Sequence, residues 1–470
     1  MKILFINPPT ENMLTTNIPE VIEEGKGAIP PLGIMYIASY LKKYTDHKIQ
    51  ILDLQLEEKN KKEIQEYLLQ EKPDVVGLTA ITFLMIDTIK LINLISKILP
   101  DTKIVLGGPH VNIYPNETID IPGIDFLVLG EGEIPCLDLI NNIEDKEKLK
   151  TIKGLVFKHD GQIVNTGNRE LLEDLDQLPH PVRELTNYKK YYSTLSYKNP
   201  TTSMFTSRGC PYKCIFCDRP HLGKNFRARS AQNIVDEMEE IKELGIHEIF
   251  IYDDTFTINR ERVVEVCNEI LKRNLKINWD IRARVNTIDE ELLILMKKAG
   301  CVRIHYGVES GVNEILKNLR KGITVDMVKK AFLATKKARI ETAAYFMIGC
   351  PGEKLKDINQ SIKLAKDLKP DYVHFSVLTP FPATEIYLVG LKNGLIKEDV
   401  WQKFAKHPTK DFVPPLWKEN FNRVELIYHL KRAYKIFYLR PSYIFNRIFK
   451  LRSFTEFLNK AKVGLKMLRI

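Results

Sequence analysis

The sequence predicts an α/β chain with two parallel-sheet units, a doubly wound N-terminal sheet and a partial barrel of six βα units, followed by a helical basic segment. Three observations lead to this fold class. Apolar strand segments alternate with amphipathic helical stretches, which is typical of parallel sheets with helical crossovers. The alternation restarts near Thr201, after a polar stretch marked by prolines. The basic excess is confined to residues 421–470.

Composition and charge narrow the function classes. The chain has 470 residues, 44% apolar and 28% charged, which suits two or three ordinary cores and excludes a disordered chain. Residues 421–470 carry twelve basic and two acidic side chains, a net +10, and the rest carries 58 of each sign. A nucleic-acid groove would place the excess on the folded domain that reads it, so we exclude nucleic acid as the main partner.

Cysteine usage and hydropathy indicate the compartment. The chain has seven cysteines, an odd number, and they form one close cluster rather than a disulfide framework. Asn7-Pro8-Pro9 interrupts the first apolar strand too early for a signal peptide, and no run of about 18 apolar residues occurs. We therefore expect a cytoplasmic protein.

Residues 1–145 form the first unit, for which we expect a Rossmann-like, doubly wound parallel sheet. The expected strands are Lys2 to Pro9, Lys48 to Leu54, Val75 to Ile81, Lys103 to Pro109 and Ile124 to Gly132. Glycines and prolines gather where three of these strands end, at residues 7–9, 107–109 and 130–133. One such loop alone reads as a tight turn. Three at one sheet edge favour a bulky ligand that approaches the backbone.

Residues 146–200 form the expected linker, with a hairpin-like stretch at His159-Asp160-Gly161. Residues 201–395 form the expected barrel. We expect it to be partial and open, because six strands in this span are too few for a closed barrel of eight. The expected strands are Thr201 to Ser207, His247 to Asp254, Ile277 to Arg284, Cys301 to Glu309, Thr342 to Gly349 and Tyr372 to Thr379. Each ends in polar or distinctive residues, so the carboxyl face is the expected active site. Residues 396–470 are the helical C-terminal region.

Cys210, Cys214 and Cys217 follow the first barrel strand with the spacing C-x3-C-x2-C. A structural zinc site would need four ligands, usually from two C-x2-C pairs, and no second pair exists. Three thiolates on one loop suit three irons of a cubane whose fourth iron stays open. A zinc site completed by His221 or a distant cysteine remains the alternative.

With this motif, the sequence resembles the radical S-adenosylmethionine family, in its branch with an N-terminal cobalamin-binding domain, over about residues 1 to 390. The resemblance implies a [4Fe-4S] cluster on Cys210, Cys214 and Cys217. Phe216, just before the third cysteine, also matches. The resemblance further implies reductive cleavage of S-adenosylmethionine to a 5'-deoxyadenosyl radical, with flavodoxin or ferredoxin as the electron donor.

The resemblance implies contacts to S-adenosylmethionine from the strand ends. Asp253 and Asp254 would accept hydrogen bonds from the methionine ammonium, and Arg282 or Arg284 would pair with its carboxylate. Glu309 and Ser310 resemble ribose and methionine contacts, and Gly349 would lie beside the adenine. Taken singly, each polar residue fits a surface or salt-bridge role equally well. In chain order the implied contacts are Tyr252, Asp253, Asp254, Arg282, Arg284, Glu309, Ser310 and Gly349.

The N-terminal loops resemble those that bind cobalamin without a histidine lower ligand, since the D-x-H-x-x-G motif of the other form is absent. Residues 29–33 look like further contacts of this kind. The implied contacts are Asn7, Pro8, Pro9, Thr79, Thr82, Gly107, Gly108, Pro109, His110, Gly130, Glu131, Gly132 and Glu133.

The resemblance implies a methyltransferase that methylates an unactivated carbon through the adenosyl radical and methylcobalamin. A cyclase of the anaerobic magnesium-protoporphyrin ester type is the alternative, and a non-catalytic cobalamin or redox sensor is the alternative from another class. His305 and His374 fall on barrel strands, where they could face a substrate or be interior histidines. The substrate-side segment 380–384 has Ala383 where relatives often have glycine.

The C-terminal segment adds ten aromatics to its twelve bases between residues 421 and 470. Such helices can lie on anionic membranes, near a hydrophobic or lipid-like small-molecule substrate. A helical cap on the barrel with a solvated basic face is an equally good interpretation.

Overall fold

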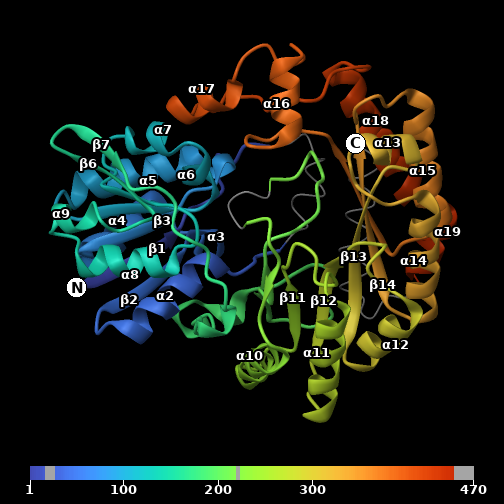
Figure 1. Cartoon of the computed structure of the whole chain (residues 1–470), viewed down its shortest axis with the longest axis horizontal. Coiled ribbons are helices and arrows are strands. Elements are labelled where there is room, and N and C mark those ends of the chain that lie inside the picture. Colours follow the sequence, from blue (N-terminus) through green and yellow to red (C-terminus); the bar gives the residue numbers. More distant parts are fainter. Residues whose placement is uncertain (16–26, 219–222, 449–470) are drawn as a thin grey trace.

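The computed structural model describes residues 1–15, 27–218 and 223–448. His221, the alternative zinc ligand, and residues 449–470 of the basic tail lie outside this range. The N-terminal unit and the barrel lie side by side, and the C-terminal helices α16 (Glu385–Lys392) and α17 (Val400–Lys406) run across between them (Figure 1). The predicted fold class is confirmed.

The N-terminal sheet has the strand order β2-β1-β3-β4-β5-β6-β7. Strands β1 to β5 are parallel, and β6 and β7 add an antiparallel hairpin to β5. The hairpin extends the sheet to Asn165, past the boundary that we expected at residue 145. The strands are β1 (Lys2–Asn7), β2 (Lys48–Asp53), β3 (Val75–Thr79), β4 (Lys103–Gly107), β5 (Phe126–Val128), β6 (Leu155–His159) and β7 (Gln162–Asn165).

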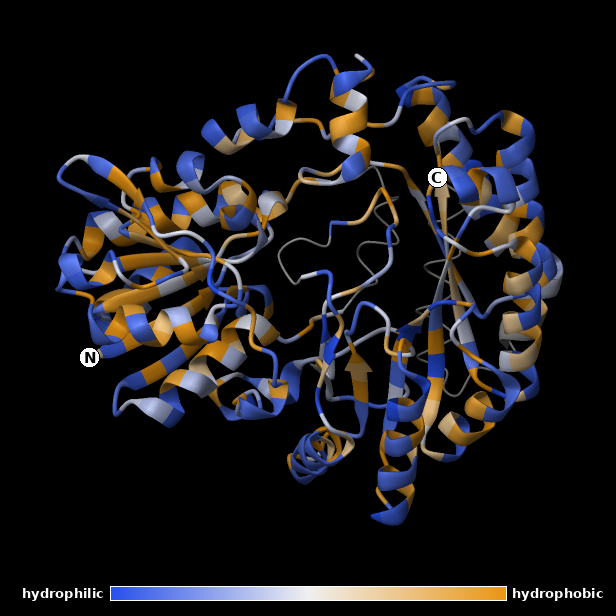
Figure 2. Cartoon of the chain, in the orientation of Figure 1, coloured by the Kyte–Doolittle hydropathy of each residue, from blue (hydrophilic) through white to orange (hydrophobic). Residues whose placement is uncertain are grey.

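Helices cover this sheet because its parallel strands are apolar runs that must be buried on both faces. Figure 2 shows the hydrophobic strands between helices with hydrophilic outer faces. Helix α4 begins with a capping box, in which Asn60 and Glu63 satisfy each other's backbone N–H groups. The helices are α2 (Leu32–Tyr44), α3 (Leu54–Glu57), α4 (Lys61–Glu71), α5 (Met85–Ile98), α6 (Pro109–Ile113), α7 (Pro115–Ile119), α8 (Glu133–Asn141) and α9 (Lys146–Leu149).

The barrel is an open, all-parallel sheet of six strands in the order β15-β14-β13-β12-β11-β8. A two-stranded ribbon, β9 (Ser207–Arg208) with β10 (Arg227–Ala228), follows the first strand and leads to the cysteine loop. The strands are β8 (Thr201–Met204), β11 (Glu248–Ile251), β12 (Asn278–Ala283), β13 (Cys301–Glu309), β14 (Glu341–Ile348) and β15 (Tyr372–Val377).

The outer helices of the barrel are amphipathic and share one core with the strands, centred on residues such as Trp279 and Phe375. Side-chain caps begin several of them; Ser230, for example, accepts from the N–H of Asn233 at the start of α10. These helices are α10 (Ala231–Glu243), α11 (Arg260–Lys272), α12 (Glu290–Lys298), α13 (Asn313–Asn318), α14 (Val325–Lys337) and α15 (Leu355–Leu368).

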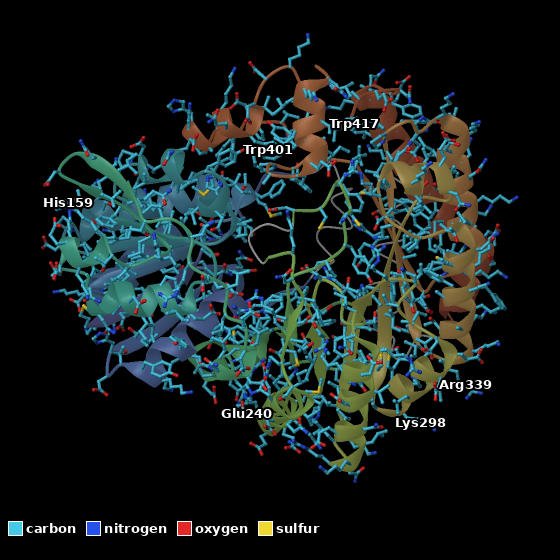
Figure 3. All side chains as sticks on the ribbon, viewed as in Figure 1. His159, Glu240, Lys298, Arg339, Trp401 and Trp417 are labelled. Atoms are coloured by element: carbon cyan, nitrogen blue, oxygen red, sulfur yellow. The ribbon has the colours of Figure 1, made fainter. Side chains whose placement is uncertain are left out.

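The C-terminal region contacts both units. Trp401 of α17, labelled in Figure 3, packs in the N-terminal core against Phe83 at a ring distance of 5.9 Å. Helix α18 (Arg423–Tyr438) covers edge strand β15, and α19 (Pro441–Ile448) follows it. The hydroxyls of Tyr434 and Tyr438 each accept a backbone N–H of β15 and donate to a carbonyl of the same residue. Of the two interpretations of the tail, the cap therefore describes residues 423–438.

Candidate active site

The three cysteines lie on the loop after β9, at the carboxyl ends of the barrel strands. Cys210, Cys214 and Cys217 line one cavity, here named the cysteine cavity, with about 1090 Å³ of empty space including its open mouth. Partial burial raises the pKa of the Cys210 thiol. Within residues 1–15, 27–218 and 223–448, no three His, Cys, Asp or Glu side chains are grouped to hold one metal ion. Three thiols that line one cavity could each bind one iron of a cluster.

Adjacent aspartates at the end of β11 have different environments. Asp253 is fully buried, and its Oδ1 accepts the N–H groups of Thr206 (2.7 Å) and Ser207 (3.1 Å). Its Oδ2 accepts both of their hydroxyls and lies 3.5 Å from Nη2 of Arg262. Asp253 thus holds the strand that leads to the cysteine loop and does not line the cavity. Asp254 is exposed and lines the cysteine cavity.

The two expected arginines also differ. Arg284 is buried; its guanidinium lies 3.8 Å from the ring centroid of Tyr212, and Nη1 lies 3.6 Å from Sγ of Cys214. Its Nη2 donates to the carbonyl of Lys321. Because these contacts occupy Arg284, it acts as a cation beside the cysteine loop. Arg282, two residues earlier on β12, is exposed in the cysteine cavity.

Glu309 ends β13 in a left-handed conformation, with φ 67°. Its Oε1 lies 2.6 Å from Nζ of Lys321, and both side chains line the cysteine cavity. A Cβ on Gly307 would lie 2.5 Å from the same oxygen, so a larger residue there would displace the side chains of this ion pair. Strained backbone held by surrounding contacts is typical of functional sites.

Of the remaining expected contacts to S-adenosylmethionine, Phe216 lines the cysteine cavity. Ser310 and Gly349 line neither cavity described here. Ser310 is fully buried, with its hydroxyl 3.3 Å from that of Ser361. The N–H of Gly349 donates to Glu353 at 2.6 Å. These two residues shape the loops behind the cavity rather than its wall.

A second cavity, here named the sheet-edge cavity, lies between the carboxyl edge of the N-terminal sheet and the barrel. It holds about 1040 Å³ of empty space including its mouth. Of the expected cobalamin contacts, Thr79, Gly107, Gly108, Gly130, Glu131, Gly132 and Glu133 line it, together with Gly33 of the segment 29–33. From the barrel side, Phe205, Ser207, Arg208, Tyr252 and Asp254 complete the wall.

Glycines make the sheet-edge cavity. A Cβ added to Gly33 or Gly130 would meet no atom within 4 Å, and one on Gly107 would meet its first neighbour at 3.7 Å. Such side chains would therefore project into open space, and their absence leaves an apolar cradle between Phe5 and Val128. A flat, bulky group such as a corrin ring fits a glycine cradle at this sheet edge.

Six expected cobalamin contacts do not line the sheet-edge cavity, namely Asn7, Pro8, Pro9, Thr82, Pro109 and His110. The Asn7 amide donates to Asp53 at 2.8 Å. Nδ1 of His110 lies 3.0 Å from the Thr82 hydroxyl, and burial lowers the pKa of His110 to about 4. The side chains of Asn7, Thr82 and His110 thus bond to neighbours within the sheet unit instead of lining the cavity.

An ion cluster at the wall of the sheet-edge cavity joins the N-terminal sheet unit to the barrel and was not expected from the sequence. Arg208, two residues before Cys210, contacts Glu133 at 2.5 Å and Glu131 at 3.0 Å. Arg227 also contacts Glu131, at 2.9 Å. The side chains are nearly buried, so the pairing is weakly screened. The cluster links the 130–133 loop of the N-terminal sheet to the strand before the cysteine loop.

Lys321 and Tyr345 line the cysteine cavity without having been expected from the sequence. Lys321 lies in the loop between α13 and α14, and Tyr345 lies within β14, so neither carries a strand-end signal. The strand alternation that places Tyr345 inward is visible in the sequence, but it does not single this residue out. His305, one of the two strand histidines, also lines this cavity.

Family models and relatives match both units. The model of the radical SAM superfamily matches residues 204–365, and that of the B12 binding domain matches residues 20–140. An uncharacterized methyltransferase of Pyrococcus horikoshii is 33% identical over 97% of this chain and 96% of its own. The anaerobic magnesium-protoporphyrin IX monomethyl ester cyclase of Rubrivivax gelatinosus is 30% identical over 94% of this chain and 78% of its own.

Solved structures share the fold. The radical S-adenosylmethionine methyltransferase TsrM from Kitasatospora setae, with cobalamin and a [4Fe-4S] cluster bound, superposes with a TM-score of 0.68 at 20% identity, over 83% of this chain and 75% of its own. The cobalamin-dependent S-adenosylmethionine radical enzyme OxsB, with aqua-cobalamin and S-adenosylmethionine bound, superposes with a TM-score of 0.74 at 18% identity, over 99% of this chain and 72% of its own.

Proposed function

The chain belongs to the cobalamin-binding radical S-adenosylmethionine family, and we propose that this enzyme methylates an unactivated carbon of a small molecule. A methyltransferase relative that matches almost the whole chain supports methyl transfer. When bound, the cluster with S-adenosylmethionine supplies a hydrogen-abstracting radical, and cobalamin supplies a transferable methyl group.

The observation that carries the proposal is that the two cavities meet. Asp254 lines both, and Tyr252 lines the sheet-edge cavity beside it. A substrate carbon held near Asp254 would therefore be within reach of both cofactor cavities. This arrangement is what a reaction needs when one carbon first loses hydrogen and then receives a methyl group.

We propose the following roles for the residues of the site. Cys210, Cys214 and Cys217 hold the cluster, and Asp254 accepts a hydrogen bond from the methionine ammonium. The glycine loops leave room for the corrin ring, with no histidine as lower ligand. Arg208, through its ion pairs with the 130–133 loop, holds the N-terminal sheet unit against the barrel and so fixes the relative position of the two cavities. Flavodoxin or ferredoxin would deliver electrons, in the reducing cytoplasm.

The experiment is an anaerobic assay of the chain reconstituted with iron, sulfide and cobalamin, then given reductant and S-adenosylmethionine. We expect both S-adenosylhomocysteine and 5'-deoxyadenosine by mass spectrometry, the former only when cobalamin is present. Cys217→Ala should abolish both products. Cys267→Ala is the matched control, because Cys267 lies in the barrel core away from both cavities.

A binding experiment tests the sheet-edge cavity separately. Gly33 lies on helix α2 with open space where a side chain would go, so Gly33→Leu should fill the cavity without straining the helix. We expect it to lower the cobalamin retained after gel filtration, as read from its absorbance. Lys42→Leu, on the exposed end of the same helix, is the control. Equal retention by both variants would place cobalamin elsewhere.

Ring formation is the second candidate, favoured by the similarity of 94% of the chain to a cyclase. Formation of 5'-deoxyadenosine without S-adenosylhomocysteine would support it over methyl transfer.

A peripheral membrane contact near a hydrophobic substrate is a further part of the proposal. Val424 and Tyr428 of α18, and Phe445 of α19, are more than half exposed in the basic segment. No helix in the described parts of the chain is long and apolar enough to cross a bilayer. Because residues 423–438 cap the barrel, the test keeps these helices and replaces the exposed Val424, Tyr428 and Phe445 by serine. Unchanged co-sedimentation with anionic liposomes would contradict the contact.

A further inference from the structure

Three polar side chains form a row on the barrel floor, within the cysteine cavity but away from the cysteines. Arg282 of β12, His305 of β13 and Tyr345 of β14 all line this cavity. Arg282 and His305 are direct partners in the register of the two strands. Arg284, which contacts Cys214, faces the cavity one inward position nearer the carboxyl ends. Arg282 and His305 therefore begin about 6 to 7 Å deeper in the barrel than Arg284. Tyr345 pairs with Gly307 of β13, two residues nearer the carboxyl ends than His305, and its hydroxyl reaches back to His305.

His305 and Tyr345 are held in place by hydrogen bonds. Nδ1 of His305 lies 2.8 Å from the Tyr345 hydroxyl, and its Nε2 lies 3.4 Å from Oδ2 of Asp280. Asp280 is buried and is itself held by Arg303 at 3.3 Å. The imidazole is therefore fixed between a phenol and a carboxylate, with Tyr345 36% exposed to the cavity. Both ring nitrogens of His305 are thus engaged, so His305 orients Tyr345 rather than a ligand. When Nδ1 donates to the Tyr345 oxygen, the Tyr345 hydroxyl is left to donate to a bound oxyanion.

Arg282 supplies the charge. Its guanidinium carbon lies 4.4 Å from the ring centroid of Tyr252, and Nη1 lies 3.5 Å from the Tyr252 carbonyl, a long contact. The side chain is exposed, and no acidic side chain in the described ranges forms an ion pair with it. The other two cations of the cavity are engaged, Arg284 by Cys214 and Lys321 by Glu309. Arg282 thus retains donors that face the cavity.

From this arrangement we propose that Arg282 and Tyr345, the latter oriented by His305, bind an anionic group of the substrate, a carboxylate or a phosphate. Arginine and carboxylate or phosphate oxygens match in geometry, and the partly enclosed floor strengthens the pairing. The anionic group would hold the substrate at the floor of the cysteine cavity. The reacting carbon of the substrate would then lie nearer Asp254, where the two cavities meet. That the anion belongs to the substrate rests on the proposed function; that the row binds an anion does not.

The carboxylate of S-adenosylmethionine is the competing occupant. Since this molecule is expected on the cluster, its carboxylate would lie at the level of the cysteines. The depth of Arg282 favours a different ligand. Separate measurements of the two ligands on one variant distinguish these occupants.

The test titrates the full reconstituted chain with benzoate, phenyl phosphate and the neutral control benzyl alcohol, by saturation-transfer nuclear magnetic resonance. We expect one or both anions to bind more tightly than benzyl alcohol. Arg282→Gln should weaken that binding about tenfold or more, the usual effect of losing one charge-assisted hydrogen bond, and Tyr345→Phe should weaken it less. Arg273→Gln, which alters an ion-paired arginine at the end of outer helix α11, should leave it unchanged.

Three results would overturn the proposal. The first is that neither anion binds the wild-type chain more tightly than benzyl alcohol. The second is that both bind Arg282→Gln as they bind wild type. The third is that Arg282→Gln loses affinity for S-adenosylmethionine in equilibrium dialysis while its affinity for the anions is unchanged. Because these readouts are equilibrium binding, they stand apart from a failure of methyl transfer.

Discussion

Replacing Asp253 by asparagine tests the division of roles between the adjacent aspartates. The carboxylate is fully buried, accepts four hydrogen bonds from Thr206 and Ser207, and faces buried Arg262 at 3.5 Å. The substitution removes the charge, leaves Arg262 without its acidic partner and turns one acceptor into a donor. Removing one member of a buried ion pair typically costs about 3 to 5 kcal/mol. We expect that loss in the free energy of unfolding of Asp253→Asn.

Urea unfolding followed by far-ultraviolet circular dichroism measures the change, with Asp254→Asn as the matched variant. Because Asp254 is exposed, its replacement should alter the free energy of unfolding by less than about 1 kcal/mol. It should instead weaken binding of S-adenosylmethionine about tenfold in equilibrium dialysis. The reasoning is refuted if Asp253→Asn unfolds at the wild-type urea concentration and loses S-adenosylmethionine, since that result would return the ammonium contact to Asp253.

Three further perturbations have clear expected outcomes. Two buried arginines hold the pKa of Glu237 at about 2, below its usual 4.5. Its ionised carboxylate therefore stabilises the fold by about 3 kcal/mol above pH 4.5, and this contribution disappears as the pH falls towards 2. The difference in free energy of unfolding between wild type and Glu237→Gln, measured in urea, should shrink over that window, and a constant difference would contradict this. Ala383 has φ 61°, so Ala383→Gly should raise the free energy of unfolding by about 0.5 to 1 kcal/mol, and a lower urea midpoint would show the turn is not strained. Arg284 donates to Cys214, and a nearby cation favours the reduced state of a cluster. Arg284→Gln should therefore lower the reduction potential of the cluster, by about 60 mV for each 1.4 kcal/mol of electrostatic stabilisation that is lost, in redox titrations monitored by electron paramagnetic resonance. An unchanged potential would show that Arg284 does not act on the cluster.

Local patterns in the sequence were sufficient for the fold class. Strand segments show as continuous apolar runs, and the helices between them show apolar spacing, because both signals depend on neighbours in the chain. The cysteine spacing is equally local, since one loop carries all three residues. The boundary after the first unit was harder to place: the hairpin β6–β7 joins the N-terminal sheet through pairing with β5, which its own sequence does not reveal.

The roles of individual site residues needed the tertiary structure. Asp253 and Asp254 look alike in the sequence, but successive side chains at a strand end point to opposite sides, so one is buried and the other lines both cavities. Arg282 and Arg284 both face the barrel interior, and only their depths and partners separate them. Lys321 reaches the cavity from a loop, where no periodic pattern exists.

The sequence by itself determined which elements form and where the loop with the three cysteines lies, because those features follow from spacing along the chain. Only the tertiary structure decided which side chains share a cavity. The pair of Arg208 and Glu133 joins residues 75 positions apart, and it exists because the sheet unit docks against the barrel. Contacts of this kind depend on how two folded surfaces pack together, and residues at such an interface show no periodic pattern in the sequence of either segment.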